Sequence, residues 1–561
     1  MNAPQPLSAT ITNREKWLLL ISLMVCLFVG ALDQTVVSTA TPKILADLGG
    51  FHLLSWLFTS YMLTSTVVIP LVGKLGDQFG RKHFLIAGVA LFIVSSAACG
   101  AAPTMEALIA FRAVQGLGGG MIFASVFATL GDMFTPAERG KYVGFFTGTF
   151  SLASLIGPTL GGFLTDNGGW RWIFLINVPV GLIAIPAIWF NLPAKARVHR
   201  VNIDFAGAGV LAAASVLFLL AFVWAGEKYP WGSVQIIGLL GASTALVGLF
   251  TWLELRHPDP ILPLHLFKNR TFLVSNLVVF AFGLGVFGAF QYLGLFVQTA
   301  LGASATASGI VSTPQSVGVL FASIVGGQML SRFGRYKWQT VFGCALIAAG
   351  EWLLTLLNAD MPTWHISVYV IVLGLGFGLV LPTMSLIVQN AVPFQYMGVA
   401  TSSSQFFRQM GSVMGIAIFG SILTNVYASE LDTRFSAADR AAVGPAITSE
   451  FEDPTSPLNE GRFAAVEAQV RALPQGDEIL ARIERASALS VAGATHVIFV
   501  GSFIAALISL MFALFLKDVP LRRTADIVKE AAPSAPSPPA STAAPVGSAG
   551  KQEAGPSPGG R

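Results

Sequence analysis

Residues Gly73–Lys82 read GKLGDQFGRK and place one acid, three cations and three glycines within ten positions. Long apolar runs with almost no charge lie on both sides of this stretch. A helix of about 20 apolar residues is long enough to cross the hydrocarbon core of a bilayer. The pattern therefore predicts that Gly73–Lys82 is a charged hairpin that joins two membrane-spanning helices.

The composition of the whole chain agrees with a membrane protein. Of the 561 residues, 54% are hydrophobic and only 11% are charged, whereas a soluble protein carries about 25% charged residues. We expect fourteen spans and hence an all-α integral membrane protein. They cover roughly residues 17–40, 53–72, 83–101, 104–131, 141–166, 172–192, 206–225, 234–254, 271–298, 305–330, 338–358, 364–388, 397–425 and 493–516. The first run is longer than the apolar part of a secretory signal and thirteen more follow, so we interpret it as an uncleaved helix.

The distribution of lysine and arginine sets the expected topology, because cytoplasmic loops of membrane proteins are enriched in these residues. With the N-terminus inside, the inside loops carry 14 basic residues and the short outside loops carry 3 (Lys43, Arg171 and Lys228). The even number of spans then returns the C-terminus to the same side. We therefore expect a multi-pass protein of the cell membrane with both termini in the cytoplasm.

The stretch GGQMLSRFGRYK (Gly326–Lys337) repeats the first one after 254 residues, with Ser331 at the position of Asp77. Two copies, each after the second helix of a six-helix group, indicate two homologous halves, as in many secondary transporters. The expected organisation is a cytoplasmic N-terminus (1–16), a first six-helix bundle (17–192), a basic linker with two extra spans (193–270), a second six-helix bundle (271–516) and a disordered cytoplasmic tail (517–561). The second bundle contains a polar external segment, about 426–491, which is either a solvated connector or a lid that captures substrate.

Five stretches taken in order resemble the 14-span drug:proton antiporters of the major facilitator superfamily. They are LDQTVVSTATP (Leu32–Pro42), Gly73–Lys82, RAVQGLGGG (Arg112–Gly120), Gly148 followed by GPTLGG (Gly157–Gly162), and WRWIFLINVPVG (Trp170–Gly181). One departure is Thr41, where the family usually has an apolar residue. The resemblance implies the major facilitator fold, two six-helix bundles plus two linking helices, and proton-coupled multidrug efflux, an activity that confers antibiotic resistance.

Asp33 and Arg112 are the candidate proton-coupling residues. Asp33 lies about 16 residues into the first span, where a carboxylate costs about 2.5–3.5 kcal/mol on insertion scales. Protonation removes that cost, so such a group can titrate as its surroundings change. Arg112 has a similar expected depth in the fourth span and keeps its charge when buried. A permanent structural ion pair is the alternative, and the resemblance also assigns the arginine to proton transfer.

Other polar side chains within the spans are candidates for a substrate cavity. Glu351 has three alternatives, namely a second proton site, a binder of cationic substrates or a packing role. Arg408 is expected to line the cavity in the second half, and His496 is expected at the membrane interface. The full candidate set is Gln34, Trp56, Tyr61, Gln115, Gln291, Tyr292, Glu351, Gln389 and Arg408.

The charged stretch itself is a candidate cytoplasmic gate. We expect Asp77 to accept hydrogen bonds from backbone N–H groups at the start of the third helix and to pair with Arg81, for which Asp132 is a second candidate partner. The gate set is Gly73, Asp77, Gly80, Arg81, Lys82 and Asp132. In the fifth span, small residues and a proline predict a bend and close helix approach; they are Gly148, Gly157, Pro158, Gly161 and Gly162, a pattern that the resemblance links to antiporters.

Several other functions are excluded by the sequence. A phosphate-binding GxxxxGK[ST] loop is missing, and GLGVFG (Gly283–Gly288) lies inside an apolar run with no preceding strand, so neither ATP nor a dinucleotide is expected. The three cysteines match no metal spacing, and the basic residues form no nucleic-acid patch. We therefore expect neither an enzyme nor a cofactor, but a monomeric exporter of drug-like molecules that uses the proton gradient. The alternatives are a dedicated exporter of one metabolite, antibiotic or lipid, and a non-transporting membrane scaffold.

Overall fold

The computed structural model describes residues 12–49, 53–134, 136–193, 204–226, 228–303, 305–454, 456 and 460–521. Within them the chain is almost entirely helical, and the β-structure consists of a single bridge between Ala225 and Tyr229. The expected all-α class is therefore confirmed. Most of the basic linker, including Lys195, Arg197 and Arg200, lies outside the described residues, as do the expected N-terminal segment before Thr12 and the tail after Leu521.

Helices occupy all fourteen expected spans. The first seven are α1 (Asn13–Leu48), α2 (Leu54–Phe79), α3 (Arg81–Gly100), α4 (Met105–Met133), α5 (Pro136–Gly168), the pair α6 (Trp172–Leu175) and α7 (Asn177–Asn191), and α8 (Phe205–Trp224). The others are α9 (Val234–Glu254), the run α10 (Arg270–Phe282), η4 (Gly283–Phe287), α11 (Gly288–Leu295) and η5 (Phe296–Ala300), then α12 (Ala305–Phe333), α13 (Lys337–Thr355), α14 (Thr363–Asn390), α15 (Met397–Arg434) and α19 (Gly476–Leu514). The short helices η3 (Leu264–Lys268), η6 (Phe394–Tyr396), α16 (Ala437–Val443), α17 (Pro445–Phe451) and α18 (Glu460–Arg471) join them.

Thirteen of the described helical stretches are long and apolar enough to cross a membrane. The remaining expected span, α13, is a helix of 19 residues that packs against α14 and α19. It carries both Lys337 and Glu351. The expected count of fourteen therefore agrees with the helices present, and thirteen of them satisfy the length and composition of a membrane span.

Polar residues set where several helices begin. The hydroxyl of Thr12 accepts from the backbone N–H of Glu15, and the Glu15 carboxylate accepts from the Thr12 N–H, which forms a capping box at the start of α1. The hydroxyls of Thr104, Ser233 and Ser436 each accept from one backbone N–H in the first turn of α4, α9 and α16. Each cap satisfies backbone donors that have no partner within the helix and thereby fixes where the helix starts.

The sequence predicted a hairpin along the whole stretch Gly73–Lys82, whereas the structure confines the turn to one residue. Helix α2 continues to Phe79, α3 begins at Arg81, and only Gly80 forms the turn, with φ of 90°. Gly334, its counterpart in the second copy, also has a positive φ of 66°. Glycine adopts this conformation without steric cost. The charged side chains therefore lie on the last two turns of α2 and the start of α3, where helices fix their directions.

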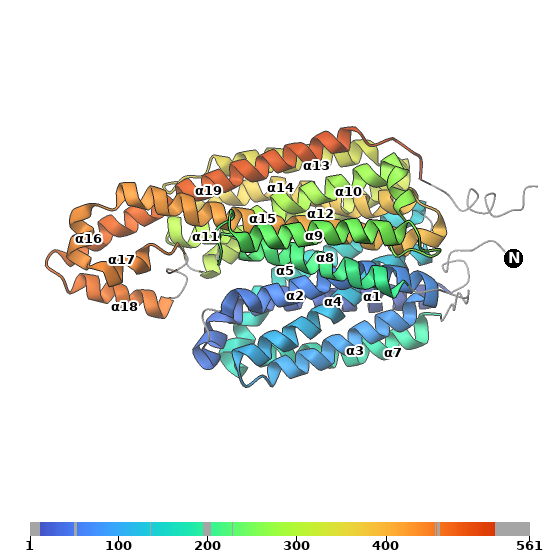
Figure 1. Ribbon diagram of the computed structural model, residues 1–561, viewed down its shortest axis with the longest axis horizontal. Helices are drawn as coiled ribbons and strands as arrows, with labels where there is room; N and C mark the ends of the chain where they lie inside the picture. The colour runs from blue at the N-terminus through green and yellow to red at the C-terminus, as the bar shows by residue number, and fades with distance from the viewer. Residues whose placement is uncertain are drawn as a thin grey trace, which may run out of the picture. The chain divides into compact units, whose positions relative to one another are not determined.

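The polar segment 426–491, which we expected to be either a solvated connector or a lid, is largely helical. α15 extends through Arg434, α19 already begins at Gly476, and α16, α17 and α18 fill much of the interval between them. These three short helices lie together at one end of the helix bundle, at the left of Figure 1. Its sequence pattern is partly helical at Ala464–Ser490, where α18 ends and α19 begins.

Two groups of helices have separate apolar cores. Buried residues of α1–α7 form clusters between positions 19 and 192, and those of α10–α19, with the loops between them, form another between positions 274 and 521. α8 packs against α9 and also contacts α2 and α15. In Figure 1 the blue and cyan helices α1–α4 and α7 lie below the yellow and red helices α13, α14 and α19, with green α8 and α9 between them in this view. Contacts between the groups run mainly through α5 with α12 and α2 with α15.

Candidate functional site

A buried ion pair joins α1 to α4. The Arg112 guanidinium donates to Asp33 through Nη1 and Oδ2, 2.5 Å apart, and both residues are 1% exposed. The second carboxylate oxygen, Oδ1, accepts from Gln115 at 2.8 Å and from Asn177 at 3.1 Å. Every described partner of the Asp33 carboxylate is thus a hydrogen-bond donor.

Two further contacts hold Arg112 in place. Its Nη1 also donates to Gln115 Oε1 at 2.8 Å, and its Cζ lies 4.4 Å from the centre of the Tyr61 ring. An arginine over an aromatic ring gains a cation–π attraction that is strongest where water is excluded. Ser96 links the amides of Gln115 and Asn177, at 3.1 Å and 3.0 Å from its hydroxyl oxygen. The site is therefore a connected polar network drawn from α1, α3, α4 and α7.

Glycines in α4 explain how α2 comes close enough to complete this network. A Cβ at Gly116 would lie 2.4 Å from the Tyr61 carbonyl oxygen, and one at Gly119 would lie 2.2 Å from the Tyr61 hydroxyl. These contacts are shorter than any side chain permits, so the GLGGG sequence is a steric requirement for placing Tyr61 over Arg112. Small residues serve the same purpose in other membrane helix pairs.

The candidate gate residues form a second polar cluster, and this cluster joins the two halves. Asp77 pairs with Arg81 at 2.6 Å and accepts from the backbone N–H groups of Gly398 at 3.1 Å and Val399 at 3.0 Å. Arg81 also pairs with Asp132 at 2.6 Å. The two expected partners of Arg81 are therefore present. The expectation that Asp77 binds the start of the third helix is wrong, because its backbone donors belong to the start of α15.

This correction has a simple physical basis. The first turn of a helix exposes N–H groups with no partner in the helix and carries a partial positive charge, both of which favour an acid. α3 directly follows Gly80, whereas α15 approaches α2 so closely that a Cβ at Gly73 would lie 2.1 Å from Ser402 Oγ. Lys82 lies apart from this contact and donates to the Trp189 carbonyl oxygen at 2.6 Å. In the second copy, Arg335 is mainly exposed and lies 3.8 Å from Asp518.

Arg139, which the topology argument counted only as a loop charge, is 1% exposed and connects the halves beside this cluster. Its guanidinium donates to the carbonyl oxygens of Gly131 at 2.5 Å and Phe134 at 2.7 Å, at the end of α4. It also donates to the side chain of Gln389 on α14. A cation at a helix C-terminus stabilises the free carbonyls there, and the bond to Gln389 adds a contact across the interface. A loop position in the sequence gives no indication of this burial.

The small residues of α5 face α1 and α12. A Cβ at Gly157 would lie 2.0 Å from Thr35 Oγ1, and one at Gly161 would lie 2.3 Å from Thr39 Oγ1, whereas Gly162 has free space around it. Gly148 faces α12, where a Cβ would lie 2.6 Å from Leu320. Pro158 lies within the helix and leaves α5 continuous as one assigned helix from Pro136 to Gly168. α5 therefore packs at close range on the helix that carries Asp33.

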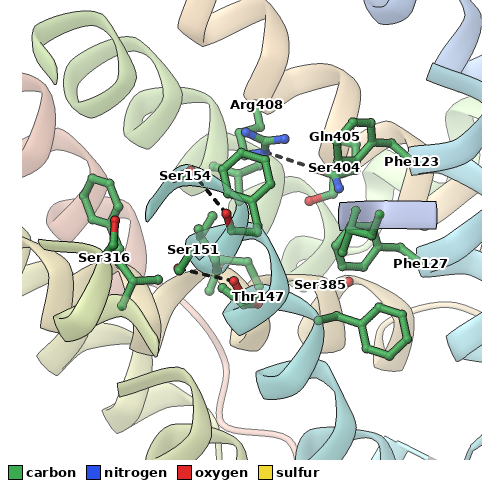
Figure 2. A pocket seen from close by; sticks show the side chains of 18 of the residues that line it. Phe123, Phe127, Thr147, Ser151, Ser154, Ser316, Ser385, Ser404, Gln405 and Arg408 are labelled. Atoms are coloured by element: carbon green, nitrogen blue, oxygen red, sulfur yellow. Dashed lines mark hydrogen bonds between the residues drawn. The ribbon is translucent and has the colours of Figure 1, made fainter. Parts of the chain in front are cut away.

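A cavity of about 160 Å³ lies where the two halves meet. Its wall is mostly aromatic and aliphatic, with six phenylalanines, several hydroxyl groups, two glutamines and Arg408. Arg408 and Gln405 are joined by a hydrogen bond of 3.0 Å, and Figure 2 shows this pair near the labelled Phe123 and Ser404. The aromatic lining residues are Phe123, Phe127, Phe146, Phe150, Phe290 and Phe377. Such a wall suits an amphipathic molecule with aromatic groups.

Of the nine residues proposed for the cavity, Arg408 is the one that lines it among those whose side chains are described. Gln115 belongs to the Asp33 network, Tyr61 covers Arg112 and Gln389 binds Arg139. Trp56 packs edge-on against Trp224, and the Tyr292 hydroxyl donates to the Ile416 carbonyl oxygen at 2.6 Å. Gln34 and Glu351 are not in the lining, and the side chain of Gln291 lies outside the described part. The sequence identified polar residues but not the side of the helix on which each lies.

Sequence reasoning did not single out Asn177 and Ser96. Asn177 belongs to the stretch WRWIFLINVPVG and is a polar amide in an otherwise apolar run, which was a usable signal. Ser96 is one of two adjacent serines in α3, and serine is common in membrane helices, so its role could not be distinguished from packing.

Comparisons with known proteins give one family match and several similar proteins. A family model described as "Major Facilitator Superfamily" matches residues 23–416. The chain is 40% identical to the multidrug transporter protein MdtP of Bacillus subtilis over 411 residues, which are 73% of this chain and 75% of that one. It is 32% identical to multidrug resistance protein 3 of the same organism, over 91% of this chain and 97% of that one.

Solved structures show the same fold at low sequence identity. The human organic anion transporter MFSD10 aligns with a TM-score of 0.57 at 14% identity and covers 88% of this chain and 100% of its own. The proton:xylose symporter XylE aligns with a TM-score of 0.56 at 12% identity and covers 93% of this chain and 100% of its own.

Proposed function

Because the chain belongs to the major facilitator superfamily, and is therefore a membrane transporter and not an enzyme, we propose that it exports amphipathic drug-like molecules across the cytoplasmic membrane in exchange for protons. The observation that carries the proposal is the buried pair of Asp33 and Arg112. A permanently charged pair in the membrane is costly to bury, and it becomes useful when one member can be neutralised by a proton. Asp33 is the member that can accept it, because arginine stays protonated in proteins.

Proton binding to Asp33 is the step that we propose drives the transport cycle. The carboxylate accepts from Arg112, Gln115 and Asn177. A proton on either oxygen removes the charge and turns one acceptor into a donor, so these three contacts from α4 and α7 weaken together. One proton moving down a gradient of one pH unit supplies about 1.4 kcal/mol, which is comparable with a hydrogen bond to a charged group, about 1.5–3 kcal/mol.

The same helices connect the proton site with the cavity. Leu27 lines the cavity on the helix that carries Asp33, and Phe123 lines it on the helix that carries Arg112. At 1.5 Å per residue, Leu27 lies about 9 Å from Asp33 along the helix axis. A change in the contact between α1 and α4 therefore alters the cavity wall directly, without an intermediate element.

Asp77 and its partners supply the gate in this proposal. We infer that the end of the bundle where α2 meets the start of α15 faces the cytoplasm and is closed in the conformation described here. The bonds from Gly398 and Val399 to Asp77 join the halves at this end. Opening toward the cytoplasm requires these bonds to break. The division into two bundles, 17–192 and 271–516, joined by two extra helices, is part of the same proposal.

A susceptibility panel in cells with and without the gene tests the transport proposal. Expression should lower the accumulation of several dissimilar amphipathic drugs, and a protonophore should restore it. Asp33→Asn should restore accumulation to the level of cells without the gene, because the site can no longer change charge. Asp47→Asn is the matched control, since Asp47 lies on the same helix but is exposed and bound to Trp170 and Arg171. Unchanged export by Asp33→Asn would refute the assignment of Asp33.

A dedicated exporter of one compound is the second candidate. One relative favours this candidate. The chain is 33% identical, over 72% of its length, to an acurin A biosynthesis cluster transporter of Aspergillus aculeatus. The same panel separates the two candidates. Export of several dissimilar drugs supports the multidrug proposal, and protection against a single compound supports the dedicated exporter.

A further inference from the structure

Glu351 is a buried acid that the proposed cycle does not use. Its residue is 0% exposed, and neither carboxyl oxygen has a hydrogen-bond partner among the described residues. It is not in the lining of the central cavity. Leaving an ionised carboxylate unpaired in such a place costs far more than binding a proton, so buried groups of this kind become neutral. The side chain is therefore accommodated here as the uncharged acid.

The packing of α13 against α19 identifies what faces Glu351. Cys344 Sγ lies 3.9 Å from Ser509 Oγ, and the Thr355 carbonyl oxygen lies 2.8 Å from His496 Nδ1. Later residues of α13 thus meet earlier residues of α19, which makes the helices antiparallel. Glu351 lies seven residues, about two turns, after Cys344, and Ser502 lies seven before Ser509. Ser502 is accordingly opposite Glu351.

Ser502 provides a second, independent sign of an unused polar site. Its hydroxyl is fully buried and has no hydrogen-bond partner among the described residues. Two polar side chains thus face each other inside an apolar interface, and the Ser502 hydroxyl is the polar group that interacts with the Glu351 carboxyl. Native structures rarely leave such groups unsatisfied, and the exceptions are often functional.

Few other titratable groups face this interface. The other helix that packs against α13 is α14. Its titratable groups are His365 and Tyr369, which lie near the C-terminal end of α13. On α19, His496 lies close to that end, is exposed and binds Thr355, which is about 6 Å along the axis from Glu351. Farther out, Arg485 of α19 pairs with Asp360. His496 is thus the titratable group between Glu351 and the solvent at this end.

We propose that Glu351 is a second proton-binding site of the transporter, in addition to Asp33. It holds a proton while α13 and α19 are packed as described, and it releases that proton to water, past His496, when the two helices separate during the cycle. This inference rests on the proposed proton-coupled export. It makes the exchange two protons for each substrate molecule, one from each half of the chain.

The first test requires no transport. Infrared difference spectra of the purified protein at neutral pH should contain the carbonyl band of a protonated carboxyl group, and Glu351→Gln should remove it. Ser502→Ala should leave the band in place, because the band belongs to the carboxyl group of Glu351. The Gln variant should also keep its melting temperature, since an amide replaces a neutral acid of the same shape. A spectrum of Glu351→Gln identical to that of the unchanged protein would overturn the inference.

The second test counts the protons. In everted vesicles with a neutral fluorescent bis-benzimidazole dye, the membrane potential is collapsed and a gradient of one pH unit is imposed. Each coupled proton allows a tenfold higher dye gradient at steady state, so two protons allow about 100-fold and one allows about tenfold. Glu351→Gln should lower the limit from about 100-fold to about tenfold. Glu254→Gln is the control and should leave the limit at about 100-fold, because Glu254 is a buried acid that already accepts hydrogen bonds from the N–H groups of Ile261 and Leu262.

The outcomes separate the two proposals. An equal steady-state gradient in the unchanged protein and in Glu351→Gln overturns the second proton site and leaves export through Asp33 intact. If the unchanged protein builds no dye gradient, the proposed function fails, whereas the infrared result still decides whether Glu351 holds a proton. A purely structural role for Glu351 would change the rate or the yield of protein, but not the steady-state limit.

Discussion

Replacing Asp77 by asparagine should open the proposed cytoplasmic gate. The Asp77 carboxylate receives two backbone N–H groups from the start of α15 and the guanidinium of Arg81. Asparagine keeps one acceptor oxygen but presents an NH₂ group to the other N–H and removes the charge. Arg81 retains Asp132 as a partner, so the change falls on the contact between the two halves.

The size of the effect follows from the bonds that are lost. A hydrogen bond to a charged group contributes about 1.5–3 kcal/mol, and an anion at a helix N-terminus contributes about 0.3–1 kcal/mol more. The closed conformation should therefore lose about 2–4 kcal/mol relative to the open one. Because 1.4 kcal/mol is a factor of about ten, the ratio of open to closed molecules should rise by about 30-fold to 1,000-fold.

Thiol labelling measures this ratio. With Cys26, Cys99 and Cys344 replaced, a single cysteine at Ser404, which lines the cavity, is labelled in inside-out vesicles by a membrane-impermeant maleimide. Asp77→Asn should increase the labelling rate by at least tenfold. Asp259→Asn is the matched control, because Asp259 binds Lys74 and Gln78 on the same turns of α2 and, among the described residues, has no hydrogen bond to α15. An unchanged rate in Asp77→Asn, or an equal increase in the control, would refute the gate.

Two further predictions concern packing and pH. Gly161→Ala should destabilise the protein by about 1–3 kcal/mol, because the new Cβ would lie 2.3 Å from Thr39 Oγ1. Gly162→Ala is the control: its new Cβ meets nothing within 4 Å, so its melting temperature should stay unchanged or rise. Equal melting temperatures of the two variants would contradict the close approach of α5 and α1. In the polar segment between α15 and α19, the hydrogen bond from Arg482 lowers the pKa of Asp439. The ionised acid therefore stabilises the contact of α16 with α19 at a pH above its unfolded pKa of about 3.9. This stabilisation is lost as the pH falls through the lower pKa of the folded state. Hydrogen exchange in α16 should therefore increase at acid pH, and Asp439→Asn should remove that dependence; an identical pH profile in the variant would count against it.

Much of the fold could be predicted because the membrane imposes a length and a composition on each span. All fourteen runs are helical, and even the ion pair of Asp33 with Arg112 was accessible, since two charges at similar depth in apolar helices need partners. The residues at which the helices end were harder to predict. α2 and α15 continue beyond their apolar parts because capping and tertiary packing, not hydropathy, end a helix.

Contacts between distant segments were the part that the sequence did not reveal. Asp77 was expected to cap the helix that follows it, but it binds the start of α15, more than 300 residues away. Arg139 was counted among the basic residues of the inside loops, although it is buried against Gln389. In both cases the residue type was informative, and the partner depends on which helices come together. Among the candidate cavity residues whose side chains are described, Arg408 alone lines the cavity, because polarity does not indicate the direction of a side chain.

The most direct test of the central claim measures transport in reconstituted proteoliposomes in which a pH gradient is the only driving force. We predict that the unchanged protein and Asp47→Asn move a fluorescent amphipathic drug against its concentration gradient, and that Asp33→Asn, inserted and folded to the same extent, moves it only down its gradient. Uphill transport by Asp33→Asn at the rate of the unchanged protein would contradict the assignment of proton coupling to Asp33.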